Sequence, residues 1–201
     1  MQRFFLILVL IAATTPASSQ VADMDFVNAV DAFSRGDYSR AIQGFSNAIG
    51  SDSTNVNAYY NRGNSYAELK NYQKAIADFS KAIELQPQFS RAYFERGTAW
   101  QLLGSLAAAI DDYTKAIELE PSYARAYYER GLAYHSLDSL SCAIADYTQA
   151  IELNPKISRA YFNRGIAHAT IGDMLKACND WQKAASMGFD DALEVIKKYC
   201  E

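Results

Sequence analysis

The stretch from Ala92 to Pro121 reads AYFERGTAWQLLGSLAAAIDDYTKAIELEP. Related copies of it recur along the chain at a constant interval of 34 residues, the distance in sequence from Ala75 to Ala109. The recurrence is clearest in three sets of small or apolar residues that keep one register. They are the pairs Ala41-Ile42, Ala75-Ile76, Ala109-Ile110 and Ala143-Ile144, the glycines Gly63, Gly97, Gly131 and Gly165, and the alanines Ala48, Ala82, Ala116, Ala150 and Ala184. A fixed period of this length is the sequence pattern of a repeat architecture.

Each repeat reads as two short amphipathic helices joined by a turn such as Leu103-Gly104-Ser105. Two such helices cannot bury their own apolar faces. Stacking one pair on the next removes this surface from water, which stabilises by about 25 cal/mol per Å² of apolar area. Pro121, after the second helix, has no N–H group and ends that helix. The pattern therefore predicts an all-α stack of helix pairs.

These residues resemble the tetratricopeptide repeat, whose small, large and proline positions they match. The small positions hold Gly63 and Ala75 or their equivalents, the large position of the second helix holds Phe45, Phe79, Tyr113, Tyr147 and Trp181, and the closing proline is Pro87, Pro121 and Pro155. The end units depart from this pattern at Ala29, Ser53 and Phe189. The resemblance implies a right-handed α-solenoid over 22–191, with five helix-turn-helix units at 22–55, 56–89, 90–123, 124–157 and 158–191.

A further amphipathic segment at 190–201 is predicted to form a helix that caps the last unit, with Cys200 on its apolar stripe. Cys178 occupies a core position of that unit where other repeats have isoleucine. Because the cap must pack on the unit, we predict a disulfide between Cys178 and Cys200. Cys142 is then the odd thiol, and we interpret it as an unreactive small residue because no base neighbours it in sequence.

Residues 1–19 have the layout of a signal peptide, with Arg3 before an apolar run from Phe4 to Ala13 and a small, polar end. The run is about half the length that a membrane-spanning helix needs. We therefore predict cleavage after Ala17 or Ser19 and a secreted or periplasmic protein. The alternative is an uncleaved N-terminal anchor.

Composition excludes nucleic acid as a partner. The 201 residues are 50% hydrophobic, which suffices for a buried interior, and the formal charge of -4 comes from acids and bases mixed along the chain. A row of phosphates would need a basic tract, and the sequence has none.

The sequence offers no catalytic residue, metal ligand set or cofactor motif. His135 and His168 are the two histidines, and they stand on successive first helices, one position short of the repeat interval. His168 replaces Tyr66, Trp100 and Tyr134 of the other repeats, so a packed interior histidine is the favoured interpretation over a catalytic or metal-binding one. We accordingly predict that the protein is not an enzyme.

An arginine and an aspartate recur together, at a constant separation, in four of the five units. The four predicted pairs are Arg62 with Asp78, Arg96 with Asp112, Arg130 with Asp146, and Arg164 with Asp180. The first unit lacks both residues and has Asn28 and Gly44 instead. Joint presence and joint absence predict a structural ion pair between the two helices of a unit, favoured over a ligand-binding role.

In the family that this sequence resembles, the first helices of successive units line a concave groove that receives peptide segments. The equivalent positions here hold an aromatic ladder of Phe26, Tyr60, Phe94, Tyr128 and Phe162, a polar row of Asn57, Arg91, Arg125 and Arg159, and a second polar row of Asn61, Glu95, Glu129 and Asn163. Arginine binds carboxylates and rings bury apolar side chains, which suits a peptide with alternating apolar and acidic groups. The alternative is that the rings only pack between units.

One specialised function within the family is not supported. Its members that grip the C-terminal carboxylates of heat-shock chaperones use lysine and asparagine at set groove positions. This chain has Tyr60 at the lysine position, Asn64 at one asparagine position and Glu95 at a further asparagine position. The leading hypothesis is a non-catalytic adaptor or scaffold that binds a protein or peptide of unknown identity in the groove. The rival hypothesis is a structural part of an envelope assembly, attached through its ends or convex face. An enzyme or enzyme accessory that uses the histidines is the weakest option.

Overall fold

The computed structural model describes residues 17–200, which form eleven helices and no strand. The helices are α1 (Ala17–Ser34), α2 (Tyr38–Ser51), α3 (Val56–Glu68), α4 (Tyr72–Leu85), α5 (Ser90–Leu102), α6 (Leu106–Leu119), α7 (Ala124–Ser136), α8 (Leu140–Leu153), α9 (Ser158–Thr170), α10 (Met174–Ser186) and α11 (Asp191–Tyr199). Most of the predicted signal segment 1–19 lies outside the described residues. Because α1 begins at Ala17, both predicted cleavage positions fall in its first turn.

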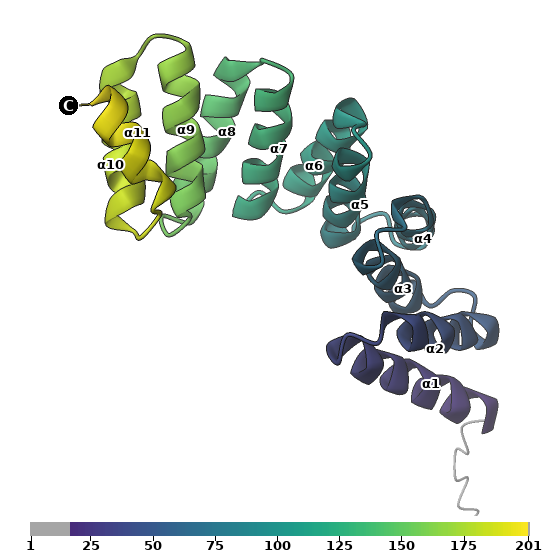
Figure 1. The fold of residues 1–201 in the computed structure, drawn as a ribbon. Coiled ribbons are helices and arrows are strands. Elements are labelled where there is room, and N and C mark those ends of the chain that lie inside the picture. Colours follow the sequence, from purple (N-terminus) through teal and green to yellow (C-terminus); the bar gives the residue numbers. More distant parts are fainter. Residues whose placement is uncertain (1–16, 201) are drawn as a thin grey trace, which may run out of the picture.

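The helices stack as pairs in a curved row, which Figure 1 shows as an arc from α1 to α11. Each odd-numbered helix from α1 to α9 packs on the even-numbered helix that follows it, and each even-numbered helix packs on the next odd-numbered one. Odd-numbered helices of successive units also touch one another, whereas the even-numbered helices of the described chain make no comparable contact. The odd-numbered helices therefore form the inner wall of the arc and the even-numbered helices its outer layer.

Small residues set the spacing of the two helices within a unit. Gly97 of α5 lies against Tyr113 of α6, and a Cβ atom at Gly97 would stand only 2.9 Å from the Tyr113 ring. Ala109 and Ala116 of α6 are wholly buried on the same side as Tyr113, at the three- and four-residue spacing of one helix face. The small residues that recur at the repeat interval thus lie where the two helices of a unit are in close contact.

The turn inside each unit requires a left-handed residue after the first helix. Gly36, Gly104 and Gly172 have φ values of 80°, 79° and 86° there. Lys70 and Asp138 occupy the same place in the second and fourth units with φ of 58°, without the freedom of glycine. The repeated backbone geometry is therefore kept even where the residue type is unfavourable.

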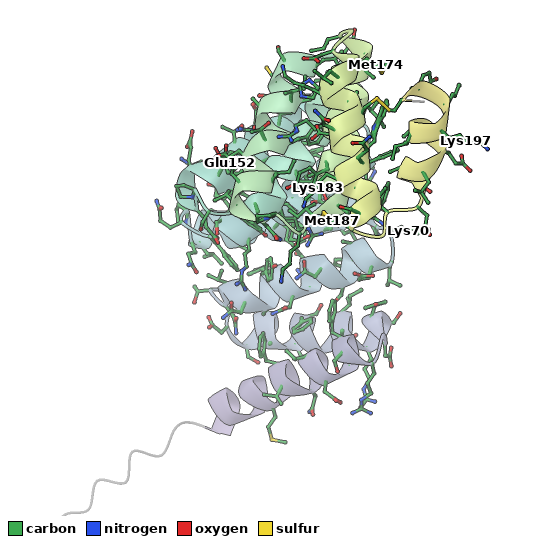
Figure 2. The ribbon with its side chains drawn as sticks, turned by 90° about the vertical axis from the view of Figure 1, so that its left-hand side faces the viewer. Lys70, Glu152, Met174, Lys183, Met187 and Lys197 are labelled. Atoms are coloured by element: carbon green, nitrogen blue, oxygen red, sulfur yellow. A yellow bond between two sulfur atoms is a disulfide. The ribbon has the colours of Figure 1, made fainter. Side chains whose placement is uncertain are left out.

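The C-terminal cap is α11, which packs on α10 through the buried Ala192. The structure joins Cys178 of α10 to Cys200 by a disulfide, with the two Cα atoms 5.8 Å apart, in agreement with the expectation from sequence. Figure 2 shows this bond near the top of α10, with Lys197 on the far side of α11. The last helix pair is thus covered by a helix that is covalently attached to it.

Candidate inner-wall binding site

The predicted groove residues lie on α3, α5, α7 and α9 and so belong to the inner wall, with Phe26 on α1. Their exposure differs sharply from one row to the next. Asn57, Arg91, Arg125 and Arg159 are exposed, while most of the aromatic and second polar rows are half-buried. The side chains of the first polar row are therefore more exposed to solvent than the aromatic rings of the ladder.

Phe94, at the centre of the aromatic ladder, is 0% exposed. Its ring packs on Tyr113 of the same unit and on Tyr123 before the next unit, with centroids 5.6 and 4.9 Å away. Arg125 covers the ring from the inner side, since its guanidinium carbon lies 4.8 Å from the Phe94 centroid. Phe94 is consequently removed from the set of groove contacts, because a cation and two rings already surround it.

The other ladder rings are half-buried and also stack on neighbours. Tyr60 packs on Phe89, at 4.9 Å, and Phe162 packs on Phe189, at 4.8 Å, so each ring spans the step to the following segment. Phe26 and Tyr128 pack on Phe45 and Tyr147 of their own units. Packing on neighbouring aromatic rings therefore accounts for much of the ladder, and only part of each of these four rings remains for a ligand.

Glu95 and Glu129 lie half-buried on neighbouring first helices. Burial raises the pKa of both carboxyl groups, and the positive charge of Arg125 offsets part of that rise. In the described part of the chain, neither carboxylate forms an ion pair, and neither does Arg91, Arg125 or Arg159. The wall thus offers unpaired charges of both signs.

Asparagines of the wall are partly committed to local hydrogen bonds. Asn61 donates through Nδ2 to the carbonyl oxygen of Asn57, at 2.8 Å. Asn163 donates to the hydroxyl oxygen of Tyr128 on the preceding first helix, at 3.1 Å, and so connects two units. Asn64 lies half-buried, one turn after Tyr60.

The four arginine–aspartate pairs are present as two-pronged contacts between the helices of each unit. In the fourth unit, Arg130 donates from Nε and Nη2 to the two carboxylate oxygens of Asp146, each at 2.8 Å. The pairs Arg62–Asp78, Arg96–Asp112 and Arg164–Asp180 repeat this geometry at 2.7–2.9 Å. Every aspartate of the set is buried, which places the pairs inside the stack.

Sequence reasoning missed the third bond of each arginine, which connects one unit to the unit before it. The Nη1 group of Arg130 donates to the hydroxyl of Thr114 on α6, at 2.9 Å. The equivalent acceptors for Arg62, Arg96 and Arg164 are Ser46, Ser80 and Thr148. A signal was present, because these hydroxyl residues recur at the repeat interval, with Gln182 at the same position of the fifth unit.

The two histidines are apart and differ in surroundings. His168 is buried, and desolvation lowers the pKa of its imidazole. His135 is half-buried, with Nδ1 3.5 Å from the Tyr147 hydroxyl, and Cys142 is exposed. Among residues 17–200, His, Cys, Asp and Glu form no cluster of three or more that could hold a metal ion. None of the helices in this part of the chain is both long and apolar enough to cross a membrane.

The sequence matches family models that are described as "Tetratricopeptide repeat" and "TPR repeat". The matches to the former are residues 56–89, 124–157 and 142–188, and those to the latter are 32–70 and 101–138. Together they cover more than half of the chain. A sequence search of curated proteins found no match.

Solved structures with the same arrangement of helices include a MamA protein, with 28% identity, a TM-score of 0.78, and coverage of 90% of this chain and 96% of that one. YrrB, described as a TPR protein with an unusual peptide-binding site, has 23% identity, a TM-score of 0.76 and coverage of 90% and 98%. The first TPR of Spaghetti (RPAP3), bound to the HSP90 peptide SRMEEVD, has 30% identity, a TM-score of 0.58 and coverage of 60% and 95%.

Proposed function

The chain belongs to the tetratricopeptide repeat family, and on this premise we propose that it is a non-catalytic adaptor that binds an extended segment of a partner protein along its inner wall. The family membership and the peptide bound to the RPAP3 repeat support a role in protein interaction. The mode of binding and the charge preference below are our proposal for this chain.

The observation that carries the proposal is the contrast between two sets of arginines. Those that face the stack, such as Arg130, have aspartate and hydroxyl partners. Arg91, Arg125 and Arg159, which recur on the inner wall at the same repeat interval, are exposed, and the described residues give none of them an ion-pair partner. A partner carboxylate can pair with each guanidinium through two hydrogen bonds. The row therefore suits an acidic ligand segment.

Glu95 and Glu129 refine the ligand that fits this wall. Burial raises the pKa of both groups, so a partner cation between them would remove an unfavourable environment for negative charge. The exposed parts of Tyr60, Tyr128 and Phe162 would contact apolar side chains of the ligand. The proposed ligand thus alternates acidic and apolar residues and carries one basic group at its middle.

Charge reversal of the row tests the proposal. Purified protein with Arg91, Arg125 and Arg159 each changed to glutamate would be crosslinked to native extracts beside the wild type. A matched control reverses Lys81, Lys115 and Lys183, which lie on the even-numbered helices of the outer layer and share one repeat position. Partners lost with the arginine variant and kept with the lysine variant support the adaptor. Partners kept with both variants contradict it and favour a structural protein attached through its ends or outer layer.

We propose further that the protein acts outside the cytoplasm, as a secreted or periplasmic protein, after removal of residues 1–19. This rests on the sequence of the N-terminal segment alone. N-terminal sequencing of the protein from its native source should find a mature chain that begins at Ser18 or Gln20. A chain that begins at Met1 would contradict cleavage.

A further inference from the structure

A cavity of about 420 Å³ opens among α8, α9 and α10, away from the inner-wall residues of the proposed ligand site. Its size falls within the roughly 300–1,000 Å³ of small-ligand pockets. The lining combines the apolar Ile144 with polar and charged groups of the last two units. The polar lining includes Thr148 of α8, Arg164 and His168 of α9, and Lys176 of α10.

The internal repeats show what this place contains elsewhere in the molecule. His168 is equivalent to Tyr66, Trp100 and Tyr134, each of which brings a larger ring. In two units, a cation lies over that ring: Lys74 Nζ is 5.3 Å from the Tyr66 centroid, and the Arg130 guanidinium carbon is 5.9 Å from that of Tyr134. Such contacts are cation–π geometry.

The last unit keeps both cations but lacks the large ring. Lys176 is the equivalent of Lys74, and Arg164 is the equivalent of Arg130. Arg164 is fixed by its bonds to Asp180, at 2.9 and 2.7 Å, and to Thr148, at 3.0 Å. The arginine that faces a ring in the fourth unit is therefore held in the same way in the fifth, where the smaller imidazole of His168 lines the cavity.

His168 itself is only 8% exposed, and its Nδ1 atom is buried without a hydrogen-bond partner in the described part of the chain. Buried polar nitrogens in proteins normally have a partner. An imidazole that lacks this bond can reorient toward a ligand that supplies one. His168 thus combines a nitrogen that lacks a partner with a place in the lining of the cavity, which favours an occupant with a polar group.

From these features we infer that the His168 cavity binds an aromatic ring with a polar group, a phenol or an indole, between the cations of Arg164 and Lys176. The ring takes the place that Tyr66, Trp100 and Tyr134 fill in their own units. It is supplied either by a free aromatic compound or by a tyrosine or tryptophan side chain of a partner. This site is independent of the inner wall, so its failure leaves the proposed adaptor function untouched.

Titration of the isotopically labelled full chain with p-cresol and with indole, followed by NMR, tests the inference. We expect saturable shifts confined to amides of α8, α9 and α10 around the cavity. The variant His168→Tyr restores the residue type of the other units, so it should fold and lose the saturable shifts. His135→Tyr is the matched control on the preceding first helix and should keep them.

A second variant tests the site by gain. Tyr66→His recreates the cavity in the second unit, beside Arg62 and Lys74, and should add a second set of saturable shifts there.

A comparison of three probes then separates the two sources of the ring. The wild-type protein is titrated with a short peptide that contains one tyrosine, with the same peptide carrying phenylalanine in its place, and with free p-cresol. Tighter binding of the tyrosine peptide assigns the site to a partner side chain, and tighter binding of p-cresol assigns it to a free compound.

Three results would overturn the inference. One is the absence of saturable shifts with every probe, and another is unchanged binding by His168→Tyr. The third is shifts that map to the apolar cavity of about 340 Å³ beside Trp181 and Val195, between the last unit and the cap, instead of to the surroundings of His168.

Discussion

The first and fourth units join their two helices by different means. In the fourth, Arg130 and Asp146 form a buried ion pair, and Gly131 of the first helix lies against the Tyr147 ring. In the first, Gly44 stands at the aspartate position and approaches Ala29 so closely that a Cβ atom at Gly44 would lie 2.8 Å from the Ala29 Cβ. Small residues in contact replace the ion pair there.

The arginine of the fourth unit also reaches the unit before it. Arg130 also bonds to Thr114 of the unit before it, so one side chain connects three helices. In the first unit, Asn28 occupies the arginine position and Gly44 the aspartate position, so the three-helix connection is absent from this unit. The arginine–aspartate pair is therefore a device for stacking units as much as for pairing helices.

Removal of the arginine from an inner unit should have the largest effect. Arg130→Met leaves the carboxylate of Asp146, whose side chain is 8% exposed, without its partner. Breaking a buried pair in this way typically costs about 3–5 kcal/mol of the free energy of unfolding. Urea denaturation measures it, with Asn28→Met as the control in the first unit, expected within about 0.5 kcal/mol of wild type. A loss of no more than about 1 kcal/mol would place the pair with ordinary surface pairs.

Transplantation of the pair into the first unit should fail. The double variant Asn28→Arg, Gly44→Asp adds a side chain where the helices are closest, at Ala29. Overpacking of this kind costs about 1–3 kcal/mol. Thermal denaturation should show a lower midpoint than for Asn28→Arg alone. A double variant that is more stable than either single change would show that close packing and ion pairing are interchangeable in this unit.

Loss of the connection between units should have a smaller effect. Thr114→Val removes the hydroxyl that accepts from Arg130 but leaves the bonds to Asp146 in place. We expect a loss of about 0.5–1.5 kcal/mol in the free energy of unfolding, by urea denaturation. Gln182→Ala, at the same position of the last unit, is the control and should change stability by less than about 0.5 kcal/mol. Equal effects at both positions would contradict a specific connection.

The smallest expected effect concerns the inner wall, where Glu95 stands at the position of Val27 in the first unit. Burial raises the pKa of Glu95 above its ordinary 4.5, so the folded protein takes up this proton at higher pH than the unfolded chain. The free energy of unfolding of the wild type therefore increases, through protonation of Glu95, as the pH falls through the folded-state pKa toward 4.5. Glu95→Gln should be more stable than wild type at pH 7, by an amount that shrinks over that range.

Urea denaturation at a series of pH values from 7 to 4 measures this difference. Glu118→Gln, at an exposed position of the outer layer, serves as the control and should show no such gain at neutral pH. A Glu95→Gln variant that is less stable than wild type at pH 7 would mean that the carboxylate has a favourable partner in the folded protein.

The number of units, the residues in close contact within each pair, and the partners Arg130 and Asp146 could all be predicted from the sequence. These features depend on the spacing of residues along one or two helices. The repeat interval and the helical period fix them without knowledge of the whole molecule. The disulfide between Cys178 and Cys200 was accessible for the same reason, since the cap must cover the last unit.

Which inner-wall groups a ligand can reach could not be predicted from the sequence and is seen only in the folded protein. Phe94 and Tyr60 occupy one repeat position, yet Phe94 is wholly buried under Arg125 of the next unit, while Tyr60 is half-buried. Exposure here depends on which side chains of the next unit cover the ring, and the spacing of residues in the sequence does not show that. The cavity beside His168 is likewise a property of the folded molecule, because residues of α8, α9 and α10 line it together.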